Sequence, residues 1–115
     1  MTNEKKVTTL VIHAPEWKVK RKGAKNFEWI MEHNMGPGYA ICKSYRSKIH
    51  RGCRVVLLRK SKPQARAEGE LVDLVFTQRF TPQGIKKFDV YTENLTKVDY
   101  KEERLNRFGI ALIDC

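Results

Sequence analysis

The order of apolar and polar residues predicts a chain made mostly of β-strands. Residues 7–13 are β-branched and apolar, which is typical of a buried strand. Residues 53–60 have a continuous apolar centre, as expected of a central strand covered on both faces. Residues 65–76 end in a period-two alternation, and residues 39–43 and 109–114 are two further short candidates. The pattern therefore predicts five strands.

The segment that follows Asn26 predicts a helix over about residues 27–34. Asparagine is a good N-cap, because its side chain can accept a hydrogen bond from the first turn. Three apolar residues share the spacing of one buried helical face: Phe27, Ile30 and Met31. At about 100° per residue, Trp29 points to the opposite, polar side. Trp29 is therefore expected to be partly exposed, which is unusual for a tryptophan.

Three more local signals complete the predicted order of elements. The Gly-Pro-Gly run at 36–38 predicts a turn. The Thr-Pro pair at 81–82 predicts a helix start, with Phe88 on the inner face of that helix. The Asp-x-x-Glu pattern at 99–102 predicts the start of a last helix, before the final strand.

The resulting order, β-α-β-β-β-α-α-β, is that of an α+β domain. The strands between residues 39 and 76 follow one another without crossover helices, which parallel neighbours would need, so a doubly wound parallel sheet is disfavoured. The chain has 115 residues, so we expect one domain over residues 1–115. Its hydrophobic fraction of 41% is enough for a core without disulfides or metal.

Net charge is the bulk property that says most about function. The chain has 23 Lys and Arg against 13 Asp and Glu, a formal net charge of +10. Such a surface attracts polyanions, of which nucleic acid is the commonest, with RNA favoured here over DNA. An anionic membrane surface is a distant second, and a surface tuned only for solubility is the other alternative.

The same composition bears on location. No apolar stretch reaches membrane-spanning length, and no signal-peptide pattern follows Met1. The cysteines, Cys42, Cys53 and Cys115, form no disulfide framework. We therefore expect a cytoplasmic protein that needs no membrane and acts as a monomer.

The basic residues are concentrated in two stretches. No acidic residue lies between Glu32 and Glu68. The nine basic residues of this interval are Lys43, Arg46, Lys48, Arg51, Arg54, Arg59, Lys60, Lys62 and Arg66. A second cluster lies upstream, in an edge strand or loop: Lys18, Lys20, Arg21, Lys22 and Lys25. Folding could join both into one stripe that replaces phosphate counterions, and two unrelated solvated faces are the alternative.

Residues 47–58, followed by residues 67–72, resemble a recurring signature of the PUA-like superfamily. The first run (SKIHRGCRVVLL) is a connector that ends in Gly before a central apolar strand, and the second (AEGELV) is a returning strand that contains a Gly. Cys53 stands where the family usually has Asp. The resemblance implies a small pseudo-β-barrel of mostly antiparallel strands with two or three short helices, similar to ASCH- and EVE-type domains.

PUA-like domains hold a base in a cleft beside the barrel, so the resemblance also implies a site. Exposed aromatic rings beside Lys and Arg suit stacking on unpaired bases, worth about 1–3 kcal/mol per base. By this analogy the stacking candidates are Trp17, Trp29 and Tyr45, of which helical phase favours Trp29. Core packing is the alternative for Trp17 and Tyr39. The nucleic-acid-binding residues expected from charge and analogy together are Lys18, Lys20, Arg21, Lys22, Trp29, Lys43, Tyr45, Arg46, Lys48 and Arg51.

Other chemistry has weaker support in the sequence. Cys42, His50 and Cys53 contain no C-x-x-C pair, so inert thiols are favoured over a zinc site or a Cys-His nucleophile, and we expect no cofactor. Glu68 and Glu70 would share one strand face, where pairing with Arg54 or Arg59 is favoured over acid–base chemistry.

Two other functions remain open at this stage. One is an enzyme acting on modified nucleosides or RNA, an amidohydrolase or nuclease like some ASCH-type relatives. It would need Lys, Thr and Glu in the cleft, for which Lys43, Thr9 and Glu70 are the candidates. The other is a basic partner of an acidic protein or a ribonucleoprotein.

Overall fold

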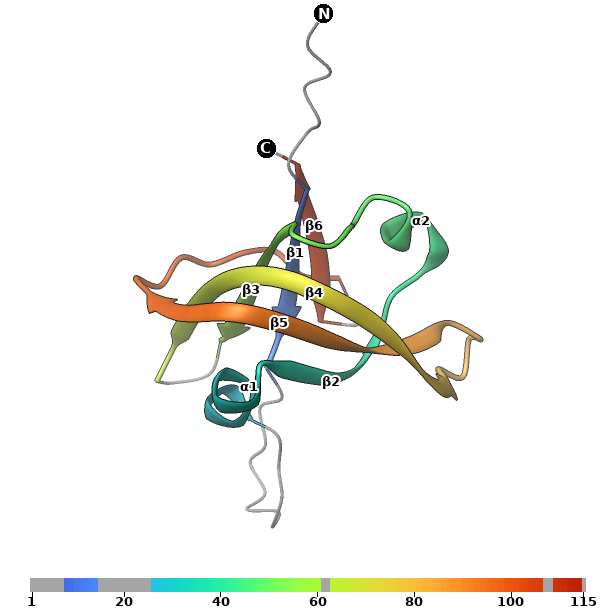
Figure 1. The fold of residues 1–115 in the computed structure, drawn as a ribbon, viewed down its shortest axis with the longest axis horizontal. Coiled ribbons are helices and arrows are strands. Elements are labelled where there is room, and N and C mark those ends of the chain that lie inside the picture. Colours follow the sequence, from blue (N-terminus) through green and yellow to red (C-terminus); the bar gives the residue numbers. More distant parts are fainter. Residues whose placement is uncertain (1–7, 15–25, 61–62, 107–108, 115) are drawn as a thin grey trace, which may run out of the picture.

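A computed structural model describes residues 8–14, 26–60, 63–106 and 109–114. They form one six-stranded sheet, curled into half a barrel, and two short helices (Figure 1). The strands are β1 (Thr8–His13), β2 (Met35–Ala40), β3 (Arg54–Arg59), β4 (Ala65–Phe80), β5 (Lys86–Val98) and β6 (Ile110–Asp114), and the helices are α1 (Phe27–His33) and α2 (Lys43–Arg46). The strand order is β2-β5-β4-β3-β1-β6, and within it β1 pairs with β3 in parallel while the other neighbours are antiparallel. A mostly antiparallel α+β fold is therefore confirmed.

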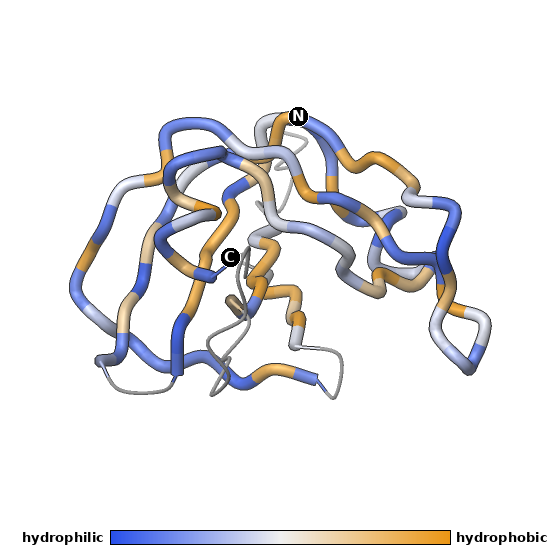
Figure 2. Tube along the Cα trace, turned by 90° about the horizontal axis from the view of Figure 1, so that it is seen from below, coloured by the Kyte–Doolittle hydropathy of each residue, from blue (hydrophilic) through white to orange (hydrophobic). Residues whose placement is uncertain are grey.

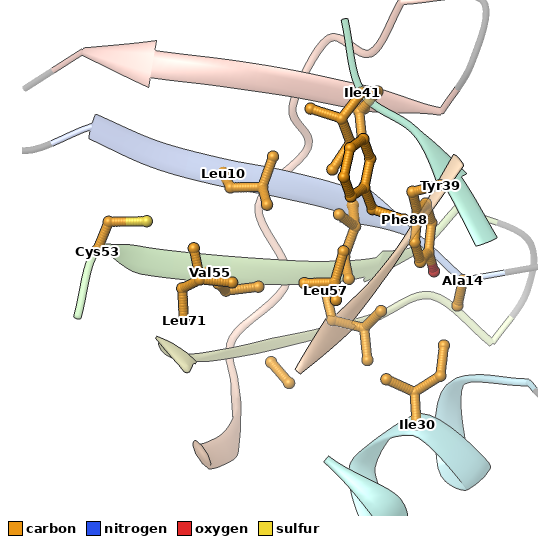
Figure 3. Close-up of a cluster of buried hydrophobic side chains, with 14 of the residues drawn as sticks. Leu10, Ala14, Ile30, Tyr39, Ile41, Cys53, Val55, Leu57, Leu71 and Phe88 are labelled. Carbon is orange, nitrogen blue, oxygen red and sulfur yellow. The ribbon is translucent and has the colours of Figure 1, made fainter. Parts of the chain in front are cut away.

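The neighbouring strands β1 and β3 are buried on both faces, as their apolar runs predict. One face belongs to a large core cluster, in which Figure 3 shows side chains from β1, β3, β5 and α1 gathered together. The fully buried members from these elements are Leu10, Ile12, Val55, Leu57, Val90, Phe27 and Ile30. The opposite face carries a smaller cluster of Val11, Val56 and Leu58, against which Tyr100 and Leu105 pack. The 99–106 segment thus closes the second face.

Helix α1 forms as predicted. The Asn26 side chain accepts a hydrogen bond from the Trp29 backbone N–H at 3.0 Å, which is the expected N-cap contact. Phe27 and Ile30 are fully buried. Asn34 ends the helix in the left-handed region, with φ of 53°, a conformation that asparagine tolerates better than most residues.

The turn predicted at 36–38 is wrong, because these residues lie inside β2. Strand β2 is at the edge of the sheet, where a proline costs no ladder hydrogen bond. The pairing with β5 shifts between Gly36 and Tyr39, so the Gly-Pro-Gly run interrupts the regular register of a strand and does not form a turn. The strand predicted at 39–43 accordingly ends at Ala40, and Lys43 already begins α2, a helix that the sequence did not predict.

The helix predicted from Thr81-Pro82 is also wrong, because this pair begins the turn of the β4–β5 hairpin. The Thr81 Oγ1 atom accepts a hydrogen bond from the Ile85 N–H at 3.1 Å, and Gly84 supplies the positive φ of 85° that the turn requires. Phe88 is buried, but it alternates with the half-buried Lys87 and Asp89 along a strand and does not lie on a helical face.

The helix predicted from the Asp-x-x-Glu pattern at 99–102 does not form either, since residues 99–106 have no regular secondary structure. Tertiary contacts decide the conformation of this segment. The Arg66 Nη1 atom donates to the Lys101 carbonyl oxygen at 2.9 Å and to the Glu103 carboxylate at 2.8 Å. The Lys60 Nζ atom lies 3.9 Å from the Glu102 Oε1 atom. Glu102 and Glu103 thus pair with Lys60 and Arg66, and the segment does not form a capped helix.

Candidate nucleic-acid interface

The basic residues between Glu32 and Glu68 fall into two groups in the structure. One group is neutralised: Arg54 and Arg66 pair with Glu68, Arg59 with Glu28, and Lys60 with Glu102. The other group makes no ion pair within the described part of the chain, and its members are Lys43, Arg46, Lys48 and Arg51. We call these four residues the free cations. All four were predicted to bind nucleic acid, while Lys62 lies outside the described residues.

The neutralised group is part of the fold. Arg66 is 7% exposed, and its Nε atom donates to the Glu68 carboxylate at 2.9 Å. Burial raises the pKa of Glu68, but hydrogen bonds and charges from Arg66 and Arg54 outweigh burial and hold that pKa below its ordinary value. The predicted pairing of Glu68 with Arg54 is confirmed, and these charges are balanced by carboxylates of the protein itself.

The free cations lie on α2 and on the loop that follows it. Tyr45, on α2, is half-buried and packs against the large core cluster, which fixes the helix on the sheet. The Ser47 hydroxyl donates to the Ser44 carbonyl oxygen at 2.8 Å and closes the end of the helix. Lys43, Lys48 and Arg51 remain exposed. Helix α2 and its loop are therefore anchored to the sheet and present several positive charges.

Arg46 connects the free cations to a row of aromatic rings. Its guanidinium carbon lies 5.0 Å from the centroid of the Phe88 ring, within the range of a cation–π interaction. Its Nε atom is buried without a hydrogen-bond partner in the described residues. From Phe88 the row continues to Phe76 at 5.7 Å between ring centroids, and from Phe76 to Phe80 at 5.4 Å in an edge-to-face arrangement. We call Phe76, Phe80 and Phe88 the aromatic row.

Sequence reasoning missed the aromatic row, because it assigned Phe88 to the inner face of a helix. One signal was present in the sequence. Residues 74–88 form a second interval without an acidic residue, and they include Arg79, Lys86 and Lys87. The structure places Lys86 on the row, with its Nζ atom 5.2 Å from the centroid of the Phe76 ring.

The other predicted site residues do not join this surface. Trp29 is half-buried as predicted, but it packs against the core and stacks on His33 with 4.0 Å between ring centroids and 11° between planes. Helices α1 and α2 lie well apart in Figure 1, so the structure does not bring Trp29 to the free cations. The remaining predicted residues fall outside the described ranges: Trp17, Lys18, Lys20, Arg21 and Lys22.

The residues considered for catalysis are divided between the two faces of the sheet. Arg54 lies between Thr9 and Glu70 in the strand register, so Thr9 and Glu70 point to the face of the smaller core cluster. Lys43 begins the helix whose Tyr45 packs on the larger cluster, at the opposite face. The three side chains therefore do not form one site.

Cys42 and Cys53, the two cysteines that the structure describes, belong to no metal site within the described ranges. The hydrogen bond between the Cys42 Sγ and Ser44 Oγ atoms, 3.2 Å long, lowers the pKa of the Cys42 thiol. Burial raises the pKa of Cys53, which lies in the large core cluster. No group of three His, Cys, Asp or Glu side chains within the described ranges is placed to hold a metal ion. A helix long and apolar enough to cross a membrane is likewise missing from those ranges.

The chain matches no protein-family model, no curated protein and no solved structure. Membership of the PUA-like superfamily therefore stays a prediction, and the function has to be argued from the residues described above.

Proposed function

We propose that this protein binds nucleic acid through α2, the loop that follows it and the aromatic row of the β4–β5 hairpin. One observation carries the proposal. Lys43, Arg46, Lys48 and Arg51 have no acidic partner among the described residues, whereas the other described cations of the same interval are neutralised. Among the described residues of this interval, the unneutralised charge is thus confined to α2 and the loop that follows it.

Confined charge of this kind suits a phosphate backbone. A Lys or Arg that replaces a condensed counterion gains the entropy of ion release, but only if it need not first leave a carboxylate. The free cations meet this condition. Arg46 is also held in place by Phe88, so less side-chain entropy is lost when it meets a phosphate.

The aromatic row favours an unpaired strand over a duplex. Phe76 and Phe80 are partly exposed, and Phe76 contacts Phe88, the ring on which Arg46 lies. Every base offers a π face to such rings. We favour RNA as the ligand, because recognition of RNA is directed mainly at unpaired loops and ends.

The proposal is tested by measuring how binding depends on salt. Fluorescence anisotropy with labelled single-stranded RNA, single-stranded DNA and duplexes, over a series of KCl concentrations, gives the slope of log K against log [salt]. For a single strand we expect about −0.7 for each phosphate neutralised. The triple variant Lys43→Gln, Lys48→Gln, Arg51→Gln should flatten that slope by about 2.

A matched triple variant separates a site from a general effect of charge. Lys97→Gln, Lys101→Gln and Arg104→Gln remove the same charge from exposed positions on β5 and the 99–106 segment. We expect this variant to keep most of the wild-type slope. Equal flattening in both triples would mean that net charge alone drives binding, and no binding at low salt would overturn the proposed function.

A further inference from the structure

The outer end of the β4–β5 hairpin has an unusual combination of side chains. Strand β4 pairs with β3 as far as Glu70, and beyond this residue the hairpin continues as an arm at one end of the molecule (Figure 1). Orange and blue segments follow one another along this arm in Figure 2, so apolar and polar residues are interleaved. We call residues 74–88 the arm. It contains three basic residues, Arg79, Lys86 and Lys87, and no acidic one.

Two aromatic rings of the arm face solvent. Phe76 is 36% exposed and Phe80 is 53% exposed, and their rings are in edge-to-face contact. Lys86 is the strand partner of Phe80, and its ammonium group lies over the ring of Phe76. A ring with an open face and a cation beside it are thus fixed on one face of the ribbon.

We propose that the arm stacks on an unpaired base, with Phe80 as the main stacking ring, Phe76 as its support and Lys86 at the phosphate of the same nucleotide. This inference rests on the proposed function and identifies the residues that would bind a base. The chemistry matches a nucleotide in two respects, because a base presents a π face and its phosphate presents the charge that Lys86 needs.

The arrangement fits a nucleotide better than an apolar partner. An apolar surface placed on Phe76 and Phe80 would desolvate Lys86, and no acidic residue of the arm could compensate it. The arm is also continuous with the free cations, since Phe88 contacts both Arg46 and Phe76. A strand whose phosphates lie along α2 and its loop can therefore place a base on the arm.

The test uses single-stranded RNA that carries the fluorescent base 2-aminopurine, whose emission falls when it stacks. With the wild-type protein we expect quenching on binding. Phe80→Ala should abolish the quenching and lower affinity about 5- to 150-fold. Phe80→Tyr, which keeps a ring, should restore both. Tyr91→Ala is the matched control, because Tyr91 is a similarly exposed aromatic residue of β5, at 38%, outside the arm.

Each result supports or overturns the inference. Heparin affinity and melting temperature should be unchanged in Phe80→Ala, since charge and core are intact. If the wild type binds RNA and Phe80→Ala shows the same quenching and the same affinity, the arm does not stack on a base. The proposed function would then still stand. Failure of the wild type to bind RNA at low salt would overturn both. A wild-type dimer that becomes a monomer in Phe80→Ala, with RNA affinity unchanged, would assign the arm to a second copy of the chain.

Discussion

The guanidinium carbon of Arg46 lies 5.0 Å from the centroid of the Phe88 ring, which joins α2 to β5. An aromatic ring holds a cation in place without neutralising its charge, whereas a carboxylate holds the cation and also neutralises it. Arg54 and Arg66, which are bound to Glu68, illustrate the second case. Arg46 is therefore anchored and still charged, the state that a phosphate-binding arginine requires.

This contact leads to a prediction for Arg46→Met, which keeps an apolar stem over Phe88 and removes the charge. Single-stranded RNA binding should weaken, and the salt slope should flatten by about 0.7, one phosphate contact. The melting temperature should change little, because the packing on Phe88 is kept. Anisotropy and thermal unfolding measure both quantities. Arg46→Met with an unchanged salt slope would remove Arg46 from the interface.

Gly69 permits the close approach of β4 to β5 at the point where their register shifts. A Cβ atom at this position would lie 2.6 Å from the Glu93 carbonyl oxygen and 3.0 Å from the Leu95 side chain. Gly69→Ala should therefore lower the free energy of unfolding by about 1–3 kcal/mol, measured by urea denaturation. Glu70→Ala, at the exposed neighbouring position, should cost less. Equal midpoints for Gly69→Ala and the wild type would show that the strands can separate without cost.

The sequence predicted those elements whose burial follows from local pattern. The run around Val55 to Leu58 is apolar at every position, so it had to be covered on both faces. Helix α1 is only about two turns long, and its N-cap Asn26 and the spacing of Phe27 and Ile30 are enough to predict it. In these segments the local preference and the tertiary contacts agree.

The sequence-based predictions were wrong where contacts with residues distant in sequence decide the local structure. The Thr81-Pro82 pair suits a helix start as well as a hairpin turn, and the pairing of Phe76 with Phe88 selects the hairpin. Contacts between residues distant in sequence also decide which arginines are neutralised by a carboxylate. Arg54 and Arg46 look alike in the sequence, but Arg54 meets a glutamate 14 residues away across the sheet, whereas Arg46 meets a ring.

Stability should fall in acid because of Glu68. Its pKa is lowered in the folded protein, so the unfolded chain takes up the proton first as the pH falls below the ordinary value of 4.5. The stabilisation by Glu68 is therefore complete above that pH and is lost as the pH falls through the lowered pKa. Glu68→Gln should be less stable at neutral pH and should lose less on acidification, as measured by urea midpoints from pH 7 to pH 3.

Glu28 provides the comparison for this prediction. It also pairs with an arginine, Arg59, but its side chain is 54% exposed, against 20% for Glu68. Water and salt screen an exposed pair, so Glu28→Gln should change the acid dependence less. A larger effect at Glu28 than at Glu68 would contradict the role given to the Glu68 network.

Trp29 distinguishes a structural residue from a binding residue. Its ring is half-buried against the core, and His33 covers one of its faces at 4.0 Å. Its contribution to the N-cap is a backbone N–H, which a substitution of the side chain retains. Trp29→Ala should therefore lower the free energy of unfolding by about 1–3 kcal/mol, less than for a fully buried tryptophan. RNA affinity, measured well below the melting temperature, should stay within about twofold of wild type, since α1 lies apart from the free cations. An affinity loss of about tenfold or more at an unchanged melting temperature would instead place a stacked base on Trp29 and move the interface to α1.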